Sequence, residues 1–468
     1  MTKDAALREG PQLAKSLLSR HVTMISIGGI IGAGLFVGSS AAIAAAGPAI
    51  TLSYVLAGSV ILLVMRMLGE MASVSPGQGS FTEYARLGLG NWAGFVTGWL
   101  YWYFWVVVVA IEAIAGAAII AAWLPLPEWQ IGLALMVILT IVNLMSTRTY
   151  GEFEFWFASI KVAAIVAFLV VGTGYLIGFT PAGGGGLHNL TAHGGFLPQG
   201  SIAVLAAITT VIFSLVGAEI AIIAAAESNE SALTISRLTI TILLRILLFY
   251  VGSILLIVMI VPWNEIRPGV SPFVMAMDRI GIPGAALIMN VIVLTAVLSC
   301  LNSGVYITSR VLFTLAAKGD APQSLIKLNA RKVPVRAILL GSSLGYGAVI
   351  TAVISPSVLF AFLLNTSGAI MLVVYLIVAL AQIQQRKALS PEQVQGLSVR
   401  MWFFPWASWL VIAAIVTVLL AMAFTSDLAS QLFASLLCTG IALFAYYLRN
   451  RSSANQLARA YNKREFIQ

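Results

Sequence analysis

Two runs of this sequence combine apolar surroundings with residues that release the backbone from a helix. The first, ISIGGIIGAGLF, contains Gly28, Gly29, Gly32 and Gly34. Glycine adopts non-helical backbone angles at little steric cost, so this run can interrupt a helix. The peptide N–H groups and the positive dipole end of the half-helix that follows would then face an anion. A carboxylate is the natural match for such a site.

The second run, FSLVGAE, ends with Glu219, two residues after Gly217. Peptide carbonyls freed near Gly217, and at the end of the first half-helix, would accept hydrogen bonds from an ammonium group. Together the two runs predict a receptor for a small zwitterion. The glycines could instead be packing notches, because Gly28 and Gly32 have the spacing of a close helix contact. Four glycines within seven residues, with a second interrupted run, favour breaks.

A third run, SCLNS, places Cys300 and Ser303 three residues apart and therefore on one helix face. Small polar residues of this kind either line a cavity or pack against another helix, and we expect a cavity here. The three runs supply the predicted substrate-binding residues: Ser26, Ile27, Gly28, Ile31, Gly32, Ala33, Gly34, Phe213, Ser214, Leu215, Val216, Gly217, Cys300 and Ser303.

The elements that carry these residues are predicted to span a membrane. Of the 468 residues, 60% are hydrophobic and only 9% are charged, whereas soluble domains have about 25% charged residues. Apolar runs of about 20 residues, long enough to cross a bilayer, recur along the chain. We expect twelve helices, at residues 21–46, 49–73, 91–121, 128–146, 155–179, 201–226, 238–261, 285–315, 336–355, 358–382, 405–424 and 430–448.

The distribution of Lys and Arg predicts the orientation of these helices. One set of connections, together with both tails, holds most of the cations: Lys3, Arg8, Lys15, Arg20, Arg86, Arg148, Arg237, Lys318, Lys327, Arg331, Lys332, Arg336, Arg386, Lys387 and Arg400. The alternate connections hold only Arg267 and Arg279. The positive-inside rule therefore puts both termini in the cytoplasm of a multi-pass protein of the cytoplasmic (inner) membrane. The net charge of +9 reflects this bias and indicates no nucleic-acid partner.

The layout divides the chain into two halves, because the interrupted runs fall in the first and sixth spans. Interrupted helices at matching positions are typical of transporters that bind substrate between the halves. The expected parts are an amino tail at 1–20, a five-helix repeat at 21–179, an external Gly-rich loop at 180–200, a second five-helix repeat at 201–382, a cytoplasmic loop at 383–404, helices 11 and 12 at 405–448, and a carboxyl tail at 449–468.

Ionisable residues inside a membrane are functional candidates, because a charge there costs roughly 2.5–3.5 kcal/mol on the insertion scale. Lys161 could take up and release a proton between wet and dry surroundings, or reach to the cytoplasmic face. Glu219 is expected to hold the unwound segment or to take part in proton movement. Glu112 either lines the substrate path or bridges helices, and Glu227 is either a gate residue or a helix-end charge.

Other classes of protein lack support in the sequence. The two cysteines lie in apolar runs, which excludes a disulfide framework, and the three histidines have no paired spacing for a metal. No phosphate-binding P-loop occurs, so we expect no cofactor and a proton gradient as the energy source. An enzyme would need a convergent nucleophile or metal cluster, and a channel would need a continuous polar pore. The sequence implies no particular oligomeric state.

Several motifs resemble those of the amino acid–polyamine–organocation transporters, in particular their bacterial amino-acid permease branch. The motifs are GGIIGAGLF from Gly28, GEMA from Gly69, GEFEFWF from Gly151 leading to Lys161, and GAE from Gly217 leading to AES from Ala226. The resemblance covers about residues 21–449. Within the branch, AAAES, SCLNS and SGAI are most similar to the stretches of 4-aminobutyrate permeases.

The resemblance implies an inverted five-plus-five repeat with discontinuous helices 1 and 6, plus two extra helices. It also implies proton-coupled uptake by alternating access, with the substrate carboxylate at residues 28–34 and its amine at residues 213–217. Lys161 would be the proton-responsive residue, and Cys300 would lie beside the pathway. The expected substrate is 4-aminobutyrate. Leu215 and Val216 depart from many relatives, so alanine, proline, an aromatic or a basic amino acid, or amino-acid exchange, stay open as alternatives.

Overall fold

The computed structural model of the chain describes residues 31–75, 81–145, 147–180, 186–217, 219 and 246–465. Within these ranges every regular element is helical. The α-helices are α3 (Ser39–Ala46), α4 (Ile50–Val74), α5 (Phe81–Leu89), α6 (Asn91–Ala121), α7 (Glu128–Met145), α8 (Thr147–Leu176), α9 (Gly200–Leu215), α12 (Ser253–Ile260), α13 (Pro272–Ile280), α14 (Ala285–Ala317), α15 (Val335–Thr351), α16 (Pro356–Lys387), α17 (Pro391–Gln395), α18 (Trp406–Ala423) and α19 (Ser426–Glu465).

Short tighter or wider turns join or begin several of these helices. They are the π-helical segments η1 (Gly34–Gly38) and η4 (Ile246–Gly252), and the 3-10 turns η2 (Gly47–Ala49), η3 (Leu187–Leu190), η5 (Trp263–Glu265) and η6 (Gln323–Ile326). η1 continues directly into α3, so residues 33–46 form one helical run. Gly47, with φ +65°, ends this run, and Pro48 starts the turn into α4.

In the part of the chain that the structure describes, eight helical segments are long and apolar enough to cross a bilayer, which indicates a multi-pass membrane protein. One of them, Gly34–Val74, contains the turn at Gly47 and therefore parts of two predicted spans. Three further helices are apolar but shorter: Gly200–Leu215, Leu247–Ile260 and Val335–Thr351. The first ends where Val216 and Gly217 leave the helix, and the second begins next to residues that the structure does not describe.

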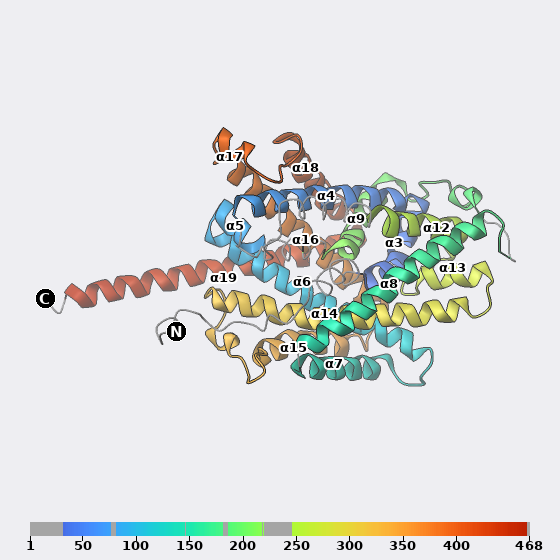
Figure 1. Ribbon diagram of the computed structural model, residues 1–468, viewed down its shortest axis with the longest axis horizontal. Helices are drawn as coiled ribbons and strands as arrows, with labels where there is room; N and C mark the ends of the chain where they lie inside the picture. The colour runs from blue at the N-terminus through green and yellow to red at the C-terminus, as the bar shows by residue number, and fades with distance from the viewer. Residues whose placement is uncertain are drawn as a thin grey trace.

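The centre of the bundle is formed by α6, α14 and α16. In the most apolar window of α6, 78% of the residues are buried, compared with 11% in that of α19. Close approach explains part of this packing: Gly368 of α16 leaves no room for a side chain, because a Cβ there would overlap the carbonyl oxygen of Thr209 on α9. Figure 1 shows the C-terminal part of α19 projecting beyond the bundle.

The two ends of the bundle differ in charge. We call them the α5 end, where α4, α14 and α16 finish, and the α13 end, where α14 and α16 begin (Figure 1). Cations in the described chain gather at the α5 end: Arg86, Lys318, Lys327, Arg331, Lys332, Arg336, Arg386, Lys387, Arg400 and Arg449. At the α13 end, the described residues include only Arg267 and Arg279. This asymmetry follows the predicted alternation of the connections.

Candidate functional site

The helix α9 stops in the middle of the protein. Its last residue is Leu215, after which Val216 is extended (φ −62°, ψ 147°) and Gly217 has φ +103°, a conformation that favours glycine. The Gly217 N–H donates to the Glu219 carboxylate at 2.9 Å, and the Tyr375 hydroxyl lies 3.5 Å from the same oxygen. Glu219 therefore holds the unwound segment, which is one of the two roles expected for it.

The helical run at residues 33–46 starts in the middle of the protein as well. Ile31 and Gly32 are non-helical, and the run begins at Ala33. The Ala33 N–H points at the Glu112 carboxylate of α6, with both oxygens 3.0 Å from the nitrogen. A free helix start thus faces a buried carboxylate, in agreement with the physical preference of such N–H groups for an anion.

The two interrupted segments are in direct contact. A Cβ added at Gly34 would lie 2.9 Å from the Cα of Ser214 and 3.0 Å from the Phe213 ring. Only glycine allows this approach. A small cavity of about 20 Å³ lies at the meeting point, with room for about one water molecule. Its lining residues are Gly34, Phe104, Trp105, Val108, Glu112, Phe213, Ser214, Val216 and Cys300. We refer to it as the central cavity.

The other predicted binding residues in the described chain are buried around the central cavity without lining it. They are Ile31, Gly32, Ala33, Leu215, Gly217 and Ser303. Ser303 lies one turn beyond Cys300 on α14. Its neighbour Asn302 accepts a hydrogen bond from Asn143 of α7 at 2.8 Å, so part of the polar run joins helices. Ser26, Ile27, Gly28 and Glu227 lie outside the described residues.

Lys161 is completely buried on α8, next to a carboxylate. Its Nζ lies 3.8 Å from the Oε1 atom of Glu154, and both side chains have 0% exposure. The Ser299 hydroxyl of α14 lies 2.8 Å from each of the two Glu154 oxygens and donates to the carboxylate. The lysine therefore does not reach to the membrane surface, and its ammonium faces a counter-charge in the bundle interior.

Two features of this site escaped the sequence reasoning. Phe104 and Trp105 belong to an aromatic run of a kind that suits the interfacial belt or the core, yet both line the central cavity. They precede Glu112 by eight and seven residues, or about two turns, so helical spacing from Glu112 could have identified them. Glu154 was quoted only as part of a motif. Its position seven residues before Lys161 places both on one face of α8.

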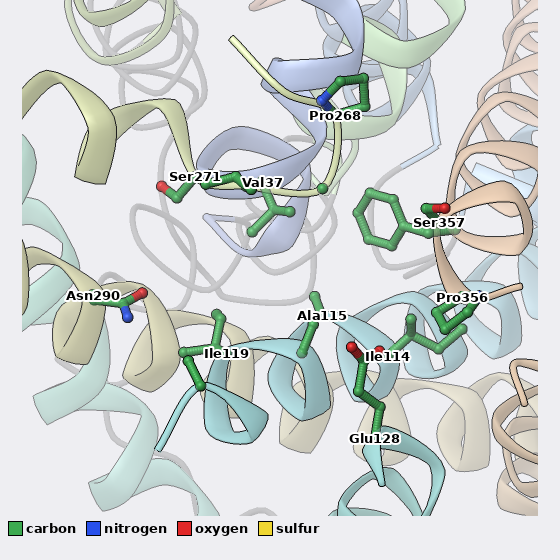
Figure 2. Close-up of a pocket in the computed structure, with 15 residues that line it drawn as sticks. Val37, Ile114, Ala115, Ile119, Glu128, Pro268, Ser271, Asn290, Pro356 and Ser357 are labelled. Carbon is green, nitrogen blue, oxygen red and sulfur yellow. The ribbon is translucent and has the colours of Figure 1, made fainter. Parts of the chain in front are cut away.

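A larger pocket lies between the central cavity and the α13 end. Its volume is about 480 Å³, and its walls come from η1, α6, α7, α14, α16 and the turn before α13. Figure 2 shows Ala115 and Ile119 of α6 pointing across this pocket toward Val37 of η1. We call this space the outer pocket. Val37 follows Gly34 by one turn, so the outer pocket and the central cavity share one helix.

At the α5 end, buried carboxylates with cationic partners join neighbouring helices. Glu70 of α4 is 1% exposed and accepts hydrogen bonds from Gln382 at 2.6 Å, Arg386 at 2.5 Å and the Met401 N–H at 2.6 Å. The ion pair between Glu70 and Arg386 joins α4 to α16. Because a buried carboxylate is costly without such partners, these contacts favour the arrangement in which α4 and α16 stay together.

A second group joins α5, the end of α14 and α19. Asp320 is paired with both Arg86 and Arg449. Glu83 of α5 lies 2.5 Å from Lys318 and 2.9 Å from Arg86. Burial alone would raise the pKa of Glu83, but the hydrogen bonds and charges of Lys318 and Arg86 outweigh burial and lower this pKa.

The amino acid permease family matches residues 21–459. The gamma-aminobutyric acid permease of Bacillus subtilis (strain 168) is 48% identical over 450 residues, covering 96% of each chain. The gamma-aminobutyric acid permease of Escherichia coli (strain K12) is 46% identical over 418 residues, covering 88% of this chain and 89% of the relative.

A relative with another named substrate is more distant. The aromatic amino acid transport protein AroP of Corynebacterium glutamicum is 40% identical over 399 residues, covering 84% of this chain and 86% of its own. The match over nearly the whole length, together with the membrane-spanning helices, identifies a transporter rather than an enzyme. The chain belongs to the amino acid permease family and transports amino acids across a membrane.

Proposed function

We propose that this protein imports 4-aminobutyrate together with a proton across the cytoplasmic membrane by alternating access. The observation that carries the substrate is the similarity to two gamma-aminobutyric acid permeases at 46–48% identity over most of the chain, above the 40% found with an aromatic amino acid transporter. The helix start at Ala33 would bind the carboxylate, and carbonyls freed after Leu215 would bind the amine. The central cavity lies between these two groups and would have to enlarge from its volume of about 20 Å³ to hold an amino acid.

The proposed topology has twelve spans, arranged as two inverted five-helix repeats with interrupted first and sixth helices and two additional helices. The helix start at Ala33 and the helix end at Leu215 support the two interruptions. The gathering of Lys and Arg at the α5 end supports a cytoplasmic location of that end and of both termini. In this orientation the outer pocket is an external vestibule.

The proposed source of energy is the proton gradient. Lys161 is the proton-responsive residue in this scheme, with Glu154 as the charge that faces it. Loss of the proton would change the balance of charge between α8 and α14, because Ser299 joins Glu154 to α14. A change of this kind can favour one of two arrangements of the helices only if their contacts with the charged pair differ.

Uptake by the purified protein in liposomes tests the proposal. We expect an imposed inward proton gradient to drive accumulation of labelled 4-aminobutyrate, and Lys161→Ala to abolish that accumulation. Uptake that ignores the gradient would refute proton coupling. Counterflow into liposomes preloaded with other amino acids separates this mechanism from exchange. Competition among 4-aminobutyrate, alanine, proline, phenylalanine and lysine for one labelled ligand tests the identity of the substrate. Strong displacement of the label by one of the other amino acids, without any by 4-aminobutyrate, would contradict the assignment of 4-aminobutyrate.

A further inference from the structure

The Glu112 carboxylate lies at the helix start at Ala33, the position proposed above for the substrate carboxylate. It is the only described side chain that receives a hydrogen bond from the N–H at the start of the helical run, and both of its oxygens lie 3.0 Å from the Ala33 nitrogen. The side chain is 1% exposed. A carboxylate therefore sits where the positive end of a helix dipole points, shielded from bulk solvent.

The backbone is shaped to admit this carboxylate. Gly32 precedes the helix start, and a Cβ at this position would overlap Oε1 of Glu112 and lie 2.7 Å from the Cys300 side chain. Any larger residue would force Glu112 away from Ala33. Gly32 thus allows the short distance between the Ala33 nitrogen and the Glu112 carboxylate, two residues that are 79 positions apart along the chain.

Space in the central cavity excludes a second carboxylate. The cavity holds about one water molecule, and Glu112 is part of its wall. An amino acid carboxylate that approached the Ala33 N–H would meet both the volume and the negative charge of Glu112. Like charges in such a site repel each other strongly, so the two carboxylates cannot share the helix start.

We propose that Glu112 is an internal competitor for the substrate carboxylate: it occupies the helix start at Ala33 when the site is empty and is displaced when an amino acid binds. This inference rests on the proposed function, because it assigns the substrate carboxylate to that helix start. Displacement would enlarge the central cavity at the same step. The empty protein would close over its own carboxylate, and the loaded protein over that of the substrate.

A different role for the same residue makes the opposite prediction. If Glu112 instead binds the substrate amine, its charge attracts the ligand, and removing the charge weakens binding. Three probes separate the two roles: 4-aminobutyrate, butyrate and n-butylamine. Butyrate has only the carboxylate, and n-butylamine has only the ammonium group.

Binding of the three probes to purified wild type and Glu112→Gln tests the proposal. Isothermal titration calorimetry is the readout, because the chain has 11 tryptophans and the fluorescence of Trp105 is not separable from the rest. The neutral amide competes less well for the Ala33 N–H. We expect tighter binding of 4-aminobutyrate and butyrate by roughly 2- to 30-fold, the range for one charge at a helix end, and little change for n-butylamine.

The matched control is Glu265→Gln, which removes a carboxylate from an exposed ion pair with Arg279. It should leave all three affinities unchanged. Glu112→Asp is a second test if the amide variant folds poorly: it keeps the charge but withdraws it from Ala33, and binding of the carboxylate probes should again tighten. Weaker binding of 4-aminobutyrate and n-butylamine in the Glu112 variants, or no change with any probe, would overturn the proposal.

Failure of the substrate assignment gives a distinct result. In that case wild-type protein does not bind 4-aminobutyrate but binds another amino acid of the competition panel. The comparison is then repeated with that amino acid, its deaminated acid and its decarboxylated amine. Tighter binding of the amino acid and the acid in Glu112→Gln would still support the competitor role, whereas the preference for 4-aminobutyrate would be lost.

Discussion

The buried pair of Lys161 and Glu154 should contribute a large coupling energy between two residues of one helix. The Nζ and Oε1 atoms are 3.8 Å apart, and neither side chain is exposed. At an effective dielectric constant of about 20, this separation corresponds to an attraction of about 4 kcal/mol. Removing one member of a buried pair typically costs about 3–5 kcal/mol, because the other charge stays buried.

A double-mutant cycle measures this coupling. Glu154→Gln removes the charge but keeps an oxygen that accepts the Ser299 hydrogen bond, and Lys161→Met replaces the ammonium by an apolar chain of similar length. Unfolding free energies in mixed micelles of increasing SDS content give the four values of the cycle. We expect each single variant to lose about 3–5 kcal/mol, and the double variant to lose clearly less than their sum.

An exposed pair in the same protein provides the control cycle. Arg279 and Glu265 are 2.9 Å apart but about half exposed, so Arg279→Met with Glu265→Gln should give a coupling below about 1 kcal/mol. Additive losses for Lys161 and Glu154 would refute the reasoning, because they would show that the two groups do not face each other as charges. Loss of gradient-driven uptake in Glu154→Gln would further connect this pair with transport.

Three further predictions concern close contacts and acid stability. Gly34→Ala should lower the initial rate of uptake more than about 10-fold, because the new Cβ would lie 2.9 Å from the backbone of α9, whereas Gly174→Ala, with nothing within 4 Å, should have a normal rate. Gly368→Ala should reduce thermal stability or the yield of monodisperse protein, because its Cβ would meet backbone of α9, and Gly347→Ala should do neither. Since the pKa of Glu83 is lowered from 4.5 in the folded protein, its stabilising effect is complete above pH 4.5 and is lost as the pH falls through the lowered pKa. The difference in Tm between wild type and Glu83→Gln should therefore shrink on acidification, and a constant difference would contradict this account.

Local sequence features predicted the elements and the ends of two helices. Apolar length indicates membrane helices because the bilayer sets a minimum span. Gly217 and Glu219 indicated the end of a helix and the carboxylate that bonds to its backbone, because the two residues are only two positions apart in the chain. Gly34 lies inside the helical run at residues 33–46 rather than at its interruption, and its close contact with α9 is a property of the folded protein that glycine spacing alone does not reveal.

Contacts between distant segments could not be predicted in this way. Sequence reasoning left Glu112 with two roles, because no local pattern shows that α6 brings its carboxylate to Ala33. The polar run on α14 was divided by the fold: Cys300 lines the central cavity, whereas Ser299 and Asn302 bind side chains of α8 and α7. Small polar residues suit either purpose, and only the neighbouring helices decide between them.

The ion pairs at the α5 end determine how much free energy the proposed alternating access requires. Opening the α5 end must either separate Glu70 on α4 from Arg386 on α16 or move both helices together. Separation leaves a buried carboxylate without its cation, at a cost of about 3–5 kcal/mol until water reaches it. Asp320 adds a similar constraint between α5 and α19. The empty protein should therefore stay closed at this end, and substrate and proton can open it only by binding the other arrangement more tightly, by an amount comparable to these costs.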